Sequence, residues 1–263
     1  MKKEKAATLA TVRLTLGPIT EAEEAQLLQI LTSKEIAETY MLPEFGSEAE
    51  ALPLARRLQA LSVSPDHVLY GIYLEGSLIG FINDVIQDGD AIEMGYVIHP
   101  DHKGNGYATE AFAAVIGQLL SMGFREIRAG AFEGNRASMR VMEKCGLTPT
   151  GQTEEIPYRG QLRRCVCYCL SRDTVIGEIR RMEALFDELQ QALAEDPAAT
   201  ESAKFRKKLR QLADYYEGGR WLRHYEMDEA GLLPHDLKRG VLSQDGVYDF
   251  LSAVEGIGTS STG

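Results

Sequence analysis

Three strand-like runs in residues 67–99 constrain the fold more than any other feature. The runs "HVLYGIYLE", "SLIGFINDVIQ" and "AIEMGYVIHP" are rich in β-branched and aromatic residues, and "EG" at 75–76 and "DGD" at 88–90 separate them. Asp-Gly between alternating runs is a strong hairpin signal. Residues 67–99 are therefore predicted to form an antiparallel meander.

A pair of glycines follows the meander directly. In "HPDHKGNGYATEA", residues 99–111, Gly104 and Gly106 flank one asparagine, and apolar residues at helical spacing predict a helix over 107–123. The first turn of a helix leaves backbone N–H groups without partners, and these groups and the helix dipole attract anions. Glycine lets the backbone approach a phosphate closely and adopt a positive φ. The stretch is therefore predicted to hold a pyrophosphate.

The common nucleotide fingerprints do not fit this stretch. Lys103 is not followed by the Gly-Lys-Ser/Thr ending of a triphosphate-binding loop, and Thr109 occupies the place of the third glycine of a dinucleotide motif. The preceding strand also belongs to an antiparallel meander rather than to a βαβ unit. A different phosphate ligand is expected.

The other elements of the first part of the chain follow from caps and periodicity. Thr20, Ser47 and Asn135 are placed to begin helices, and Gly146 to end one. The predicted helices are 20–33, 47–61 and 135–146, and the predicted strands are 11–16, 126–133, about 150–156 and 161–170. The first part is thus predicted to be an α/β domain.

The periodicity changes after Arg172. Apolar residues recur every three or four positions on both sides of "EDPAATES", which predicts an antiparallel helical hairpin, and "SQDGVYDFLSAVEG" predicts one more short helix. The expected division is a domain over 1–172, a helical domain over 173–257 and a disordered tail over 258–263.

The net charge of −11 and the composition exclude several classes of protein. A nucleic-acid binder would show a basic face, so nucleic acid is not expected as a partner. No run of about 18 apolar residues occurs, so no membrane span is expected. The start "MKKEKAATLATVRL" has no apolar run typical of a secretory signal, and a cytoplasmic location is predicted. An acidic surface suits a cationic acceptor such as an amine.

The cysteines lack the spacing of a zinc site. Cys165, Cys167 and Cys169 alternate in "CVCYC", and Cys145 stands apart. On a strand these three thiols would share one face. The cysteines have two interpretations: they are small apolar residues that fill a strand, or they form a metal or redox site. The absence of C-x-x-C pairs favours the first interpretation. No metal is predicted.

Two motifs together resemble a known family. "EMGYVIHPDHKGNGYATEA", followed by "EGNRASMRVMEKCGLTPTG", is similar to the GNAT acetyl-CoA-dependent N-acetyltransferases, in the branch that acetylates protein N-terminal amines and similar small amines. The resemblance covers about residues 10–172. The opening "TVRLTLGPIT" fits the branch, except that Gly17 stands where an arginine is common. The resemblance implies a mixed, mostly antiparallel sheet with splayed central strands, flanked by helices.

The family fold implies where acetyl-CoA lies. The pantetheine arm would occupy the gap between the strands at 93–99 and 126–133, and the pyrophosphate would rest on backbone amides. Asp101 stands where the family has Gln or Arg, which leaves the amide cradle unchanged. Asn135 is either a helix cap alone or also a contact of the cofactor arm. The residues implied to bind acetyl-CoA are Val97, Ile98, His99, Lys103, Gly104, Asn105, Gly106, Tyr107, Ala108, Thr109, Asn135 and Ser138.

The implied chemistry is direct attack of an amine on the thioester. A base must take the proton of the amine, and Glu93, on the splayed strand, is the predicted base. A solvated strand glutamate is the alternative, and Glu133 and Tyr96 are weaker candidates. The N–H near Ile98 would stabilise the oxyanion. Met142 replaces the tyrosine that often protonates the leaving thiolate, and Ser138 is the predicted substitute.

The second domain resembles an uncharacterised bacterial helical domain. Its motif "YYEGGRWLRHYEMDEAG" is either a core with a polar rim or a functional groove. The groove residues would be Tyr216, Trp221, His224, Asp228 and Asp236. The predicted activity is acetyl transfer to a small amine or a protein N-terminus. The alternative is a non-catalytic acetyl-CoA sensor or adaptor that binds a protein partner through the helical domain. The sequence specifies neither the acceptor nor the oligomeric state.

Overall fold

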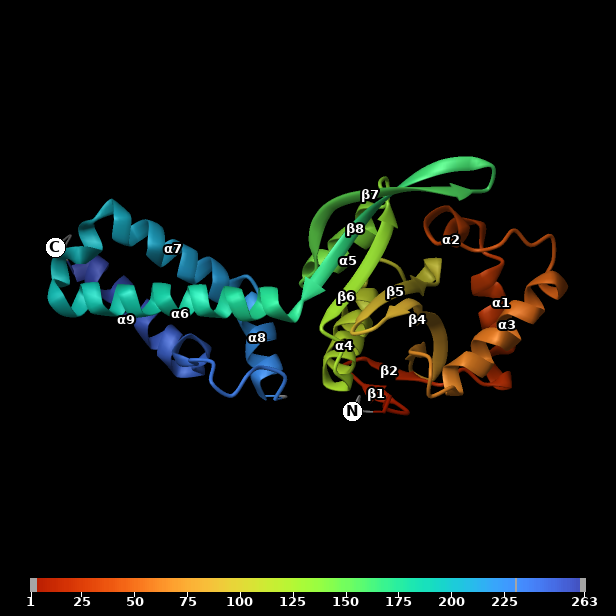
Figure 1. Cartoon of the computed structure of the whole chain (residues 1–263), viewed down its shortest axis with the longest axis horizontal. Helices are drawn as coiled ribbons and strands as arrows, with labels where there is room; N and C mark the ends of the chain where they lie inside the picture. Colours follow the sequence, from red (N-terminus) through yellow and green to blue (C-terminus); the bar gives the residue numbers. More distant parts are fainter. Residues whose placement is uncertain (1–3, 230, 261–263) are drawn as a thin grey trace. The chain divides into compact units, whose positions relative to one another are not determined.

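The computed structural model describes residues 4–229 and 231–260 (Figure 1). Contacts between residues divide the chain into two compact units, Met1–Ser171 and Arg172–Gly263. The first unit is built on a β-sheet and the second is helical. Among the described residues, no helix has the length and apolar character needed to cross a membrane.

One sheet organises the first unit. Its strands are β1 (Leu9–Ala10), β2 (Leu14–Gly17), β3 (Leu69–Leu74), β4 (Ser77–Asp88), β5 (Ala91–Ile98), β6 (Glu126–Phe132), β7 (Thr148–Tyr158) and β8 (Gln161–Ser171). Their order is β1-β2-β3-β4-β5-β6-β8-β7. Neighbouring strands are antiparallel except β5 and β6, which are parallel. The predicted meander and the mixed, mostly antiparallel sheet are confirmed.

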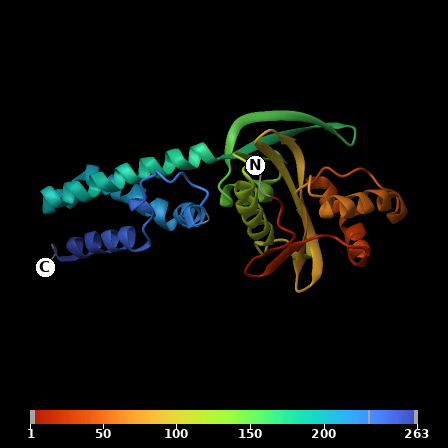
Figure 2. The same cartoon turned by 60° about the horizontal axis from the view of Figure 1, so that its bottom comes forward.

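Helices cover both faces of the sheet (Figure 2). Helices α1 (Glu24–Leu31), α2 (Lys34–Thr39) and α3 (Glu48–Val63) lie on one face, and α4 (Tyr107–Met122) and α5 (Arg136–Lys144) lie on the other. The first face buries a core that includes Leu27, Phe81 and Val97. Burying one such side chain contributes about 1.5–3 kcal/mol, so this packing fixes α1 and α3 against the meander.

The predicted caps are present. The Ala22 N–H donates to Thr20 Oγ1 at 3.2 Å, and Glu23 reaches back to the Thr20 N–H at 2.8 Å, which completes a capping box. Ser47 accepts from the Glu50 N–H at 3.4 Å and begins α3. Helix α2 was not predicted, because its six residues are too few for a periodic pattern. Ser33 caps it by accepting from the Ile36 N–H.

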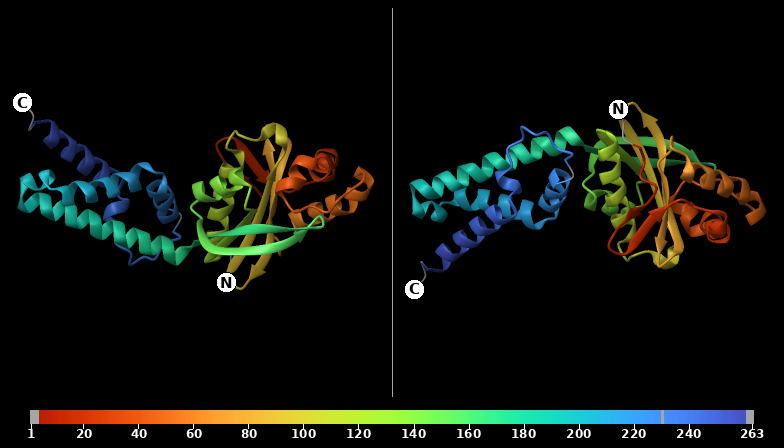
Figure 3. Two further views of the ribbon diagram at one scale, coloured as in Figure 1. Left: turned by 90° about the horizontal axis from the view of Figure 1, so that it is seen from above. Right: turned by 90° about the horizontal axis from the view of Figure 1, so that it is seen from below.

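The helical unit contains α6 (Arg172–Glu195), α7 (Ala203–Glu217), α8 (Arg220–Glu229) and α9 (Gln244–Ser260). Helix α7 runs back along α6 after a 3₁₀ turn at Pro197–Glu201, as the predicted hairpin requires (Figure 3). Helix α8 was not predicted. The tail prediction is wrong for residues 258–260, which continue α9. The rest of that predicted tail, 261–263, lies outside the described residues.

Candidate active site

The two central strands part at the site. β5 and β6 pair in parallel from Ala91 opposite Glu126 to Glu93 opposite Arg128. β6 goes on pairing with β8 as far as Phe132, so β5 and β6 diverge beyond Glu93. The predicted splay is confirmed. A cavity of about 1250 Å³ opens at the split and is lined from both faces, by α2 and α3 and by α4 and α5.

The glycine pair forms a turn suited to an anion. Gly104 and Gly106 have φ of +81° and +82°, a region that side chains disfavour. Gly106 is the N-cap of α4 and supplies no side-chain hydrogen bond to the first turn. A Cβ on Gly104 would meet nothing within 4 Å, so the backbone there is open to a ligand. The first-turn residues Tyr107, Ala108 and Thr109 line the cavity.

Arg13, just before β2, holds this turn in place. Its guanidinium donates to the Asn105 carbonyl at 3.0 Å and to Glu110 Oε2 at 2.7 Å, and it lies 4.6 Å from the centre of the Tyr107 ring. Thr11 donates to the other oxygen of Glu110 at 2.6 Å. Burial opposes ionisation of Glu110, but these hydrogen bonds lower its pKa. No local pattern predicts this role for Arg13, because it lies 92 residues from Asn105.

The residues at the end of β5 differ in where their backbone groups point. The His99 N–H donates to the Ile79 carbonyl at 2.7 Å, and its own carbonyl accepts from the His102 N–H at 2.9 Å. Hydrogen-bond directions alternate along an antiparallel strand, so the Ile98 backbone groups face the split. Val97 and Ile98 line the cavity. The His99 backbone groups are thus engaged by the sheet and the following turn, and its contact with acetyl-CoA stays a prediction.

Helix α5 brings two hydroxyls together. Asn135 Oδ1 accepts from the Ser138 N–H at 3.1 Å, so Asn135 caps the helix as predicted, and its amide donates to the Thr39 carbonyl at 3.4 Å. Ser138 Oγ lies 2.8 Å from the Tyr96 hydroxyl, which is also 3.0 Å from the Ser138 carbonyl. Burial raises the pKa of Tyr96, which keeps the phenol protonated.

Met142 fills a packing position. Its side chain is completely buried between α5 and the sheet. A thioether has no proton to donate, so this position does not supply an acid. The hydroxyl group nearest to the start of α5 comes from Tyr96 of β5, which contacts Ser138 in the first turn of the helix.

Glu93 points into the cavity from β5. It is half-buried, and it shares a face with Gly95 and Val97, as strand alternation predicts. Gly130 leaves space beside it: a Cβ there would lie 4.0 Å from Glu93 Oε1 and 3.7 Å from Cys165 Sγ. Burial, and then the nearby Glu154, raise the pKa of Glu93, although Arg128 opposes the shift. A raised pKa suits a general base that must work near neutral pH.

The thiols of β8 line the same cavity but do not form a metal cluster. Burial raises the pKa of Cys165 and of Cys169 to about 11, so both thiols stay protonated and weakly nucleophilic. Among the described residues, no three His, Cys, Asp or Glu side chains are grouped to hold a metal ion. The structure fits the interpretation that these cysteines pack on the strand face.

The cavity brings together most of the predicted site. Its lining includes Glu93, Val97, Ile98, Lys103, Gly104, Gly106, Tyr107, Ala108, Thr109, Asn135 and Ser138. Asn105 and His99 are not among the described lining residues. The Asn105 side chain instead donates to the carbonyls of His102 and Lys103 and shapes the turn. Glu133 is exposed, 3.7 Å from Arg164, and is also absent from that lining.

Further charged residues line the cavity and were missed, and three of them lie at its two ends. Arg140 and Lys144 come from α5, and Glu154 comes from β7. Arg140 and Lys144 are four residues apart and therefore share one helix face, a signal that the sequence did contain. Glu154 follows from no local pattern, because only the strand order brings β7 near β5.

The helical unit uses its conspicuous residues in packing. The Trp221 indole donates to the Val241 carbonyl at 2.7 Å and stacks on Tyr225, and Tyr216 contacts the same ring. His224 lies 3.0 Å from the Tyr215 hydroxyl, and Asp228 pairs with Arg239. Asp236 is exposed. These contacts favour a core with a polar rim over a groove.

Known proteins match the two units separately. The family model of the acetyltransferase (GNAT) domain matches residues 13–148, and a domain of unknown function (DUF4298) matches residues 179–259. An uncharacterised N-acetyltransferase, YoaA of Bacillus subtilis (strain 168), is 29% identical over 156 residues, which cover 57% of this chain and 88% of that protein.

Solved structures share the fold. The microcin C7 self-immunity acetyltransferase MccE, in complex with acetyl-CoA and AMP, matches with a TM-score of 0.55 and 17% identity, over 61% of this chain and 93% of that one. RimL, a ribosomal L7/L12 alpha-N-protein acetyltransferase, matches with a TM-score of 0.55 and 16% identity, over 65% and 95%.

A splayed sheet, a glycine turn at a helix start and the matched family model define an acyl-CoA-dependent N-acyltransferase. The chain belongs to the GNAT acetyltransferase family.

Proposed function

We propose that the protein moves an acetyl group from acetyl-CoA to a primary amine by direct attack. One observation carries this proposal: a single cavity joins the glycine turn to Glu93 through the split between β5 and β6. Donor and acceptor can therefore meet inside it from opposite faces of the sheet. Family membership supports acetyl-CoA as the donor.

The donor end is built for phosphate. The uncapped first turn of α4 offers backbone N–H groups, and the open turn at Gly104 admits a pyrophosphate. Lys103, Arg140 and Lys144 add positive charge to the lining. Because Arg13 neutralises Glu110 in the first turn, that carboxylate does not repel the phosphates. The Ile98 N–H facing the split would hydrogen-bond the acetyl carbonyl and its oxyanion.

Proton transfer would use two groups on opposite faces. The ammonium form of the acceptor gives one proton to Glu93, the neutral nitrogen forms a C–N bond with the acetyl carbon, and the C–S bond breaks. The CoA thiolate takes a proton from Ser138, whose Oγ is replenished through the Tyr96 hydroxyl 2.8 Å away. A second proton leaves the amine nitrogen as the amide forms, so the net products are an amide, CoA thiol and one proton.

The acceptor class includes protein N-termini and small amines. RimL, which shares the fold, is named for acetylating the α-amine of a ribosomal protein. Residues of α2 and α3 and of β7 as far as Ile156 line the acceptor side of the cavity, and Tyr158 at the end of the β7–β8 hairpin bonds to Ala37 of α2. An amine on a chain terminus or on a small molecule can approach Glu93 there.

The test measures free CoA thiol with acetyl-CoA and a set of amines and N-terminal peptides. Wild-type protein should release thiol with at least one acceptor, and Glu93→Gln should lower kcat by about a hundredfold with acetyl-CoA affinity unchanged. Glu133→Gln, which changes an exposed glutamate outside the described lining, is the matched control and should behave as wild type. Acetyl-CoA binding without thiol release for any acceptor would instead support a sensor, and unchanged turnover in Glu93→Gln would remove Glu93 from the mechanism.

A further inference from the structure

Besides Glu126, which pairs with Arg128, the acceptor face of the sheet carries two carboxylates from strands far apart in the sequence. Glu93 is in register with Arg128 of β6, and Glu154 of β7 is opposite Cys165 of β8. Residues directly opposite one another, or two apart on one strand, share a face, so Glu93, Gly130, Cys165 and Glu154 all lie on the same side. Both glutamates line the cavity.

Gly130 keeps the space between them open. The flanking residues of β6 on this face carry large side chains, Arg128 and Phe132, but Gly130 carries none. A Cβ at Gly130 would be in contact distance of both Glu93 Oε1 and Cys165 Sγ. The thiols of Cys165 and Cys167 respond to both carboxylates, which raise their pKa after burial. Glu93 and Glu154 therefore lie on either side of one pocket, and the uncharged thiols of Cys165 and Cys167 line its base.

Two of the neighbouring cations, Arg128 and Arg163, are engaged by other groups, although Arg128 still opposes the rise in the pKa of Glu93. Arg128 is held by Glu126 of its own strand. Arg163 of β8 lies over the Phe132 ring at 4.5 Å and donates to the Glu38 carbonyl. Farther along the wall, His67 pairs with Asp84 at 3.0 Å, and Arg57 of α3 completes the charged lining on this face. Among the described residues, neither Glu93 nor Glu154 forms an ion pair with a side chain.

The two ends of the cavity thus differ in charge. The donor end has Arg140, Lys144 and the start of α4, which suit phosphates, and Lys103, whose ammonium pairs with Glu35 at 2.7 Å. The acceptor end has Glu93, half-buried, and Glu154, exposed at the rim. One carboxylate suffices to take the proton of the reacting amine. The second, on the solvent side, is placed to meet a positive charge that the acceptor keeps throughout the reaction.

Building on the acetyl transfer proposed above, we propose that the acceptor is a dicationic amine, whose reacting nitrogen meets Glu93 and whose second cation pairs with Glu154. The second charge takes no part in bond making. The same chemistry is offered by a small diamine and by a peptide N-terminus followed by a basic residue.

The first arm of the test compares 1,4-diaminobutane with 1-aminobutane as acceptors for the full chain. Wild-type kcat/KM should favour the diamine by about fivefold, the size expected for one rim-exposed charge pair. Glu154→Gln should abolish this preference, and the measured quantity is the ratio of kcat/KM for the diamine to kcat/KM for the monoamine, because losing Glu154 also lowers the pKa of Glu93 and so affects both substrates. Glu155→Gln is the matched control, because Glu155 is the adjacent residue on the opposite face of β7 and should keep the preference.

The second arm replaces the amines with two short peptides that differ only in Lys or Leu at the second position. Preference for the Lys peptide alone identifies a protein N-terminus as the source of the dication, and preference for the diamine alone identifies a small molecule. In either case the preference should shrink as ionic strength rises.

The outcomes separate the two proposals. Thiol release without any preference in either arm overturns the dicationic acceptor and leaves the proposed acetyl transfer unaffected. An equal loss of kcat/KM in Glu154→Gln for both amines, or for both peptides, has the same consequence. The absence of thiol release with every acceptor overturns acetyl transfer, and the dicationic acceptor with it.

Discussion

Glu93 in the sheet unit and Glu183 in the helical unit are both withdrawn from water, but they differ in their partners. Glu183 of α6 is 4% exposed and accepts from the N–H groups of Gly240 and Val241 at 3.1 and 2.5 Å. Glu93 faces a cavity, without such donors, and its pKa is raised. A carboxylate whose acceptor sites are filled by its own chain holds a fold together. One left without them is available for a substrate proton.

The same contrast extends to other polar groups. In the helical unit, the buried Trp221 indole and the His224 ring both find partners within the unit. In the sheet unit, the hydroxyls of Tyr96 and Ser138 meet at the wall of the cavity. Substitutions in the helical unit should therefore act on stability, and those around the cavity on turnover or substrate binding.

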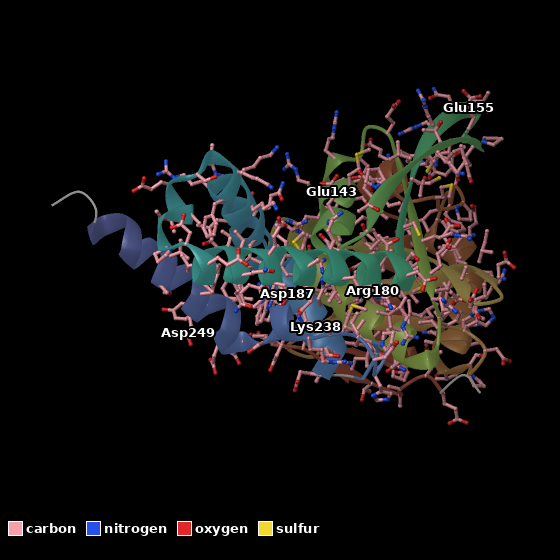
Figure 4. All side chains as sticks on the ribbon, turned by 60° about the vertical axis from the view of Figure 1, so that its left-hand side comes forward. Glu143, Glu155, Arg180, Asp187, Lys238 and Asp249 are labelled. Atoms are coloured by element: carbon pink, nitrogen blue, oxygen red, sulfur yellow. The ribbon has the colours of Figure 1, made fainter. Side chains whose placement is uncertain are left out.

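The same isosteric change at the two glutamates is the strongest way to sharpen this contrast. Glu183→Gln should lower the unfolding free energy of the helical unit by about 3 kcal/mol, because an amide cannot satisfy both backbone donors. The Lys238 ammonium, 3.2 Å from Glu183, keeps its second partner, Asp187, at 2.6 Å (Figure 4). Trp221, the single tryptophan of the chain, reports this transition by fluorescence during urea denaturation.

Glu93→Gln should leave the unfolding free energy of the sheet unit unchanged or slightly higher, as followed by circular dichroism. A half-buried carboxylate with a raised pKa weakens the fold at neutral pH, so removing its charge costs no stability. If Glu93→Gln destabilised its unit as much as Glu183→Gln does, the division between structural and functional carboxylates would be wrong.

The second-largest expected effect is a loss of stability of the helical unit at low pH. Burial, then Arg223 and Arg220, lower the pKa of His224 from 6.5 to about 4. A depressed folded-state pKa means that the neutral ring's contribution is complete above pH 6.5 and is lost as pH falls through 4. The loss is about 2–3 kcal/mol at pH 4, measured by the Trp221 fluorescence transition.

His224→Asn removes this titration while keeping an acceptor for the Tyr215 hydroxyl. The variant should be less stable than wild type at pH 7, but its stability should depend less on pH between 6.5 and 4. A slope identical to that of wild type would assign the acid sensitivity to another group.

The smallest expected effect lies at the tip of the β7–β8 hairpin. The Tyr158 hydroxyl donates to the Ala37 carbonyl at 2.7 Å and accepts from the Leu42 N–H at 3.3 Å, and so joins the hairpin to the end of α2. Tyr158→Phe should raise KM for the acceptor by about fivefold, equivalent to about 1 kcal/mol, because this joint borders the acceptor side. KM for acetyl-CoA should stay within about twofold. An equal rise in both KM values would show a general loosening of the unit instead.

Much of the fold could be predicted from local sequence patterns. The capping box at Thr20, the cap at Ser47 and the Asp-Gly turn of the meander are short-range features that can be recognised without knowing the rest of the structure. Helix α2 and the placement of β8 between β6 and β7 could not be predicted this way. The first has too few residues, and the second is a choice among long-range pairings.

The site shows the same limit. The glycine turn and Glu93 were predictable because the motif and strand alternation place them. The hydrogen bond between the His99 N–H and the Ile79 carbonyl could not be predicted by counting strand positions, because hydrogen-bond directions depend on the pairing with β4. Arg13, just before β2, and Glu154, in β7, reach the site from distant parts of the sequence, and their roles depend on the sheet order and on contacts across it.

The Arg13 contacts also decide whether the glycine turn, with its proposed affinity for phosphate, could be moved to another protein. Transplanting residues 99–111 would carry both glycines and the uncapped start of α4. It would also carry Glu110 without the guanidinium and the Thr11 hydroxyl that bind its carboxylate here. A bare negative charge in the first turn would then face the phosphates. The transferable unit is therefore the turn together with the beginning of β2, two segments that the chain keeps about ninety residues apart.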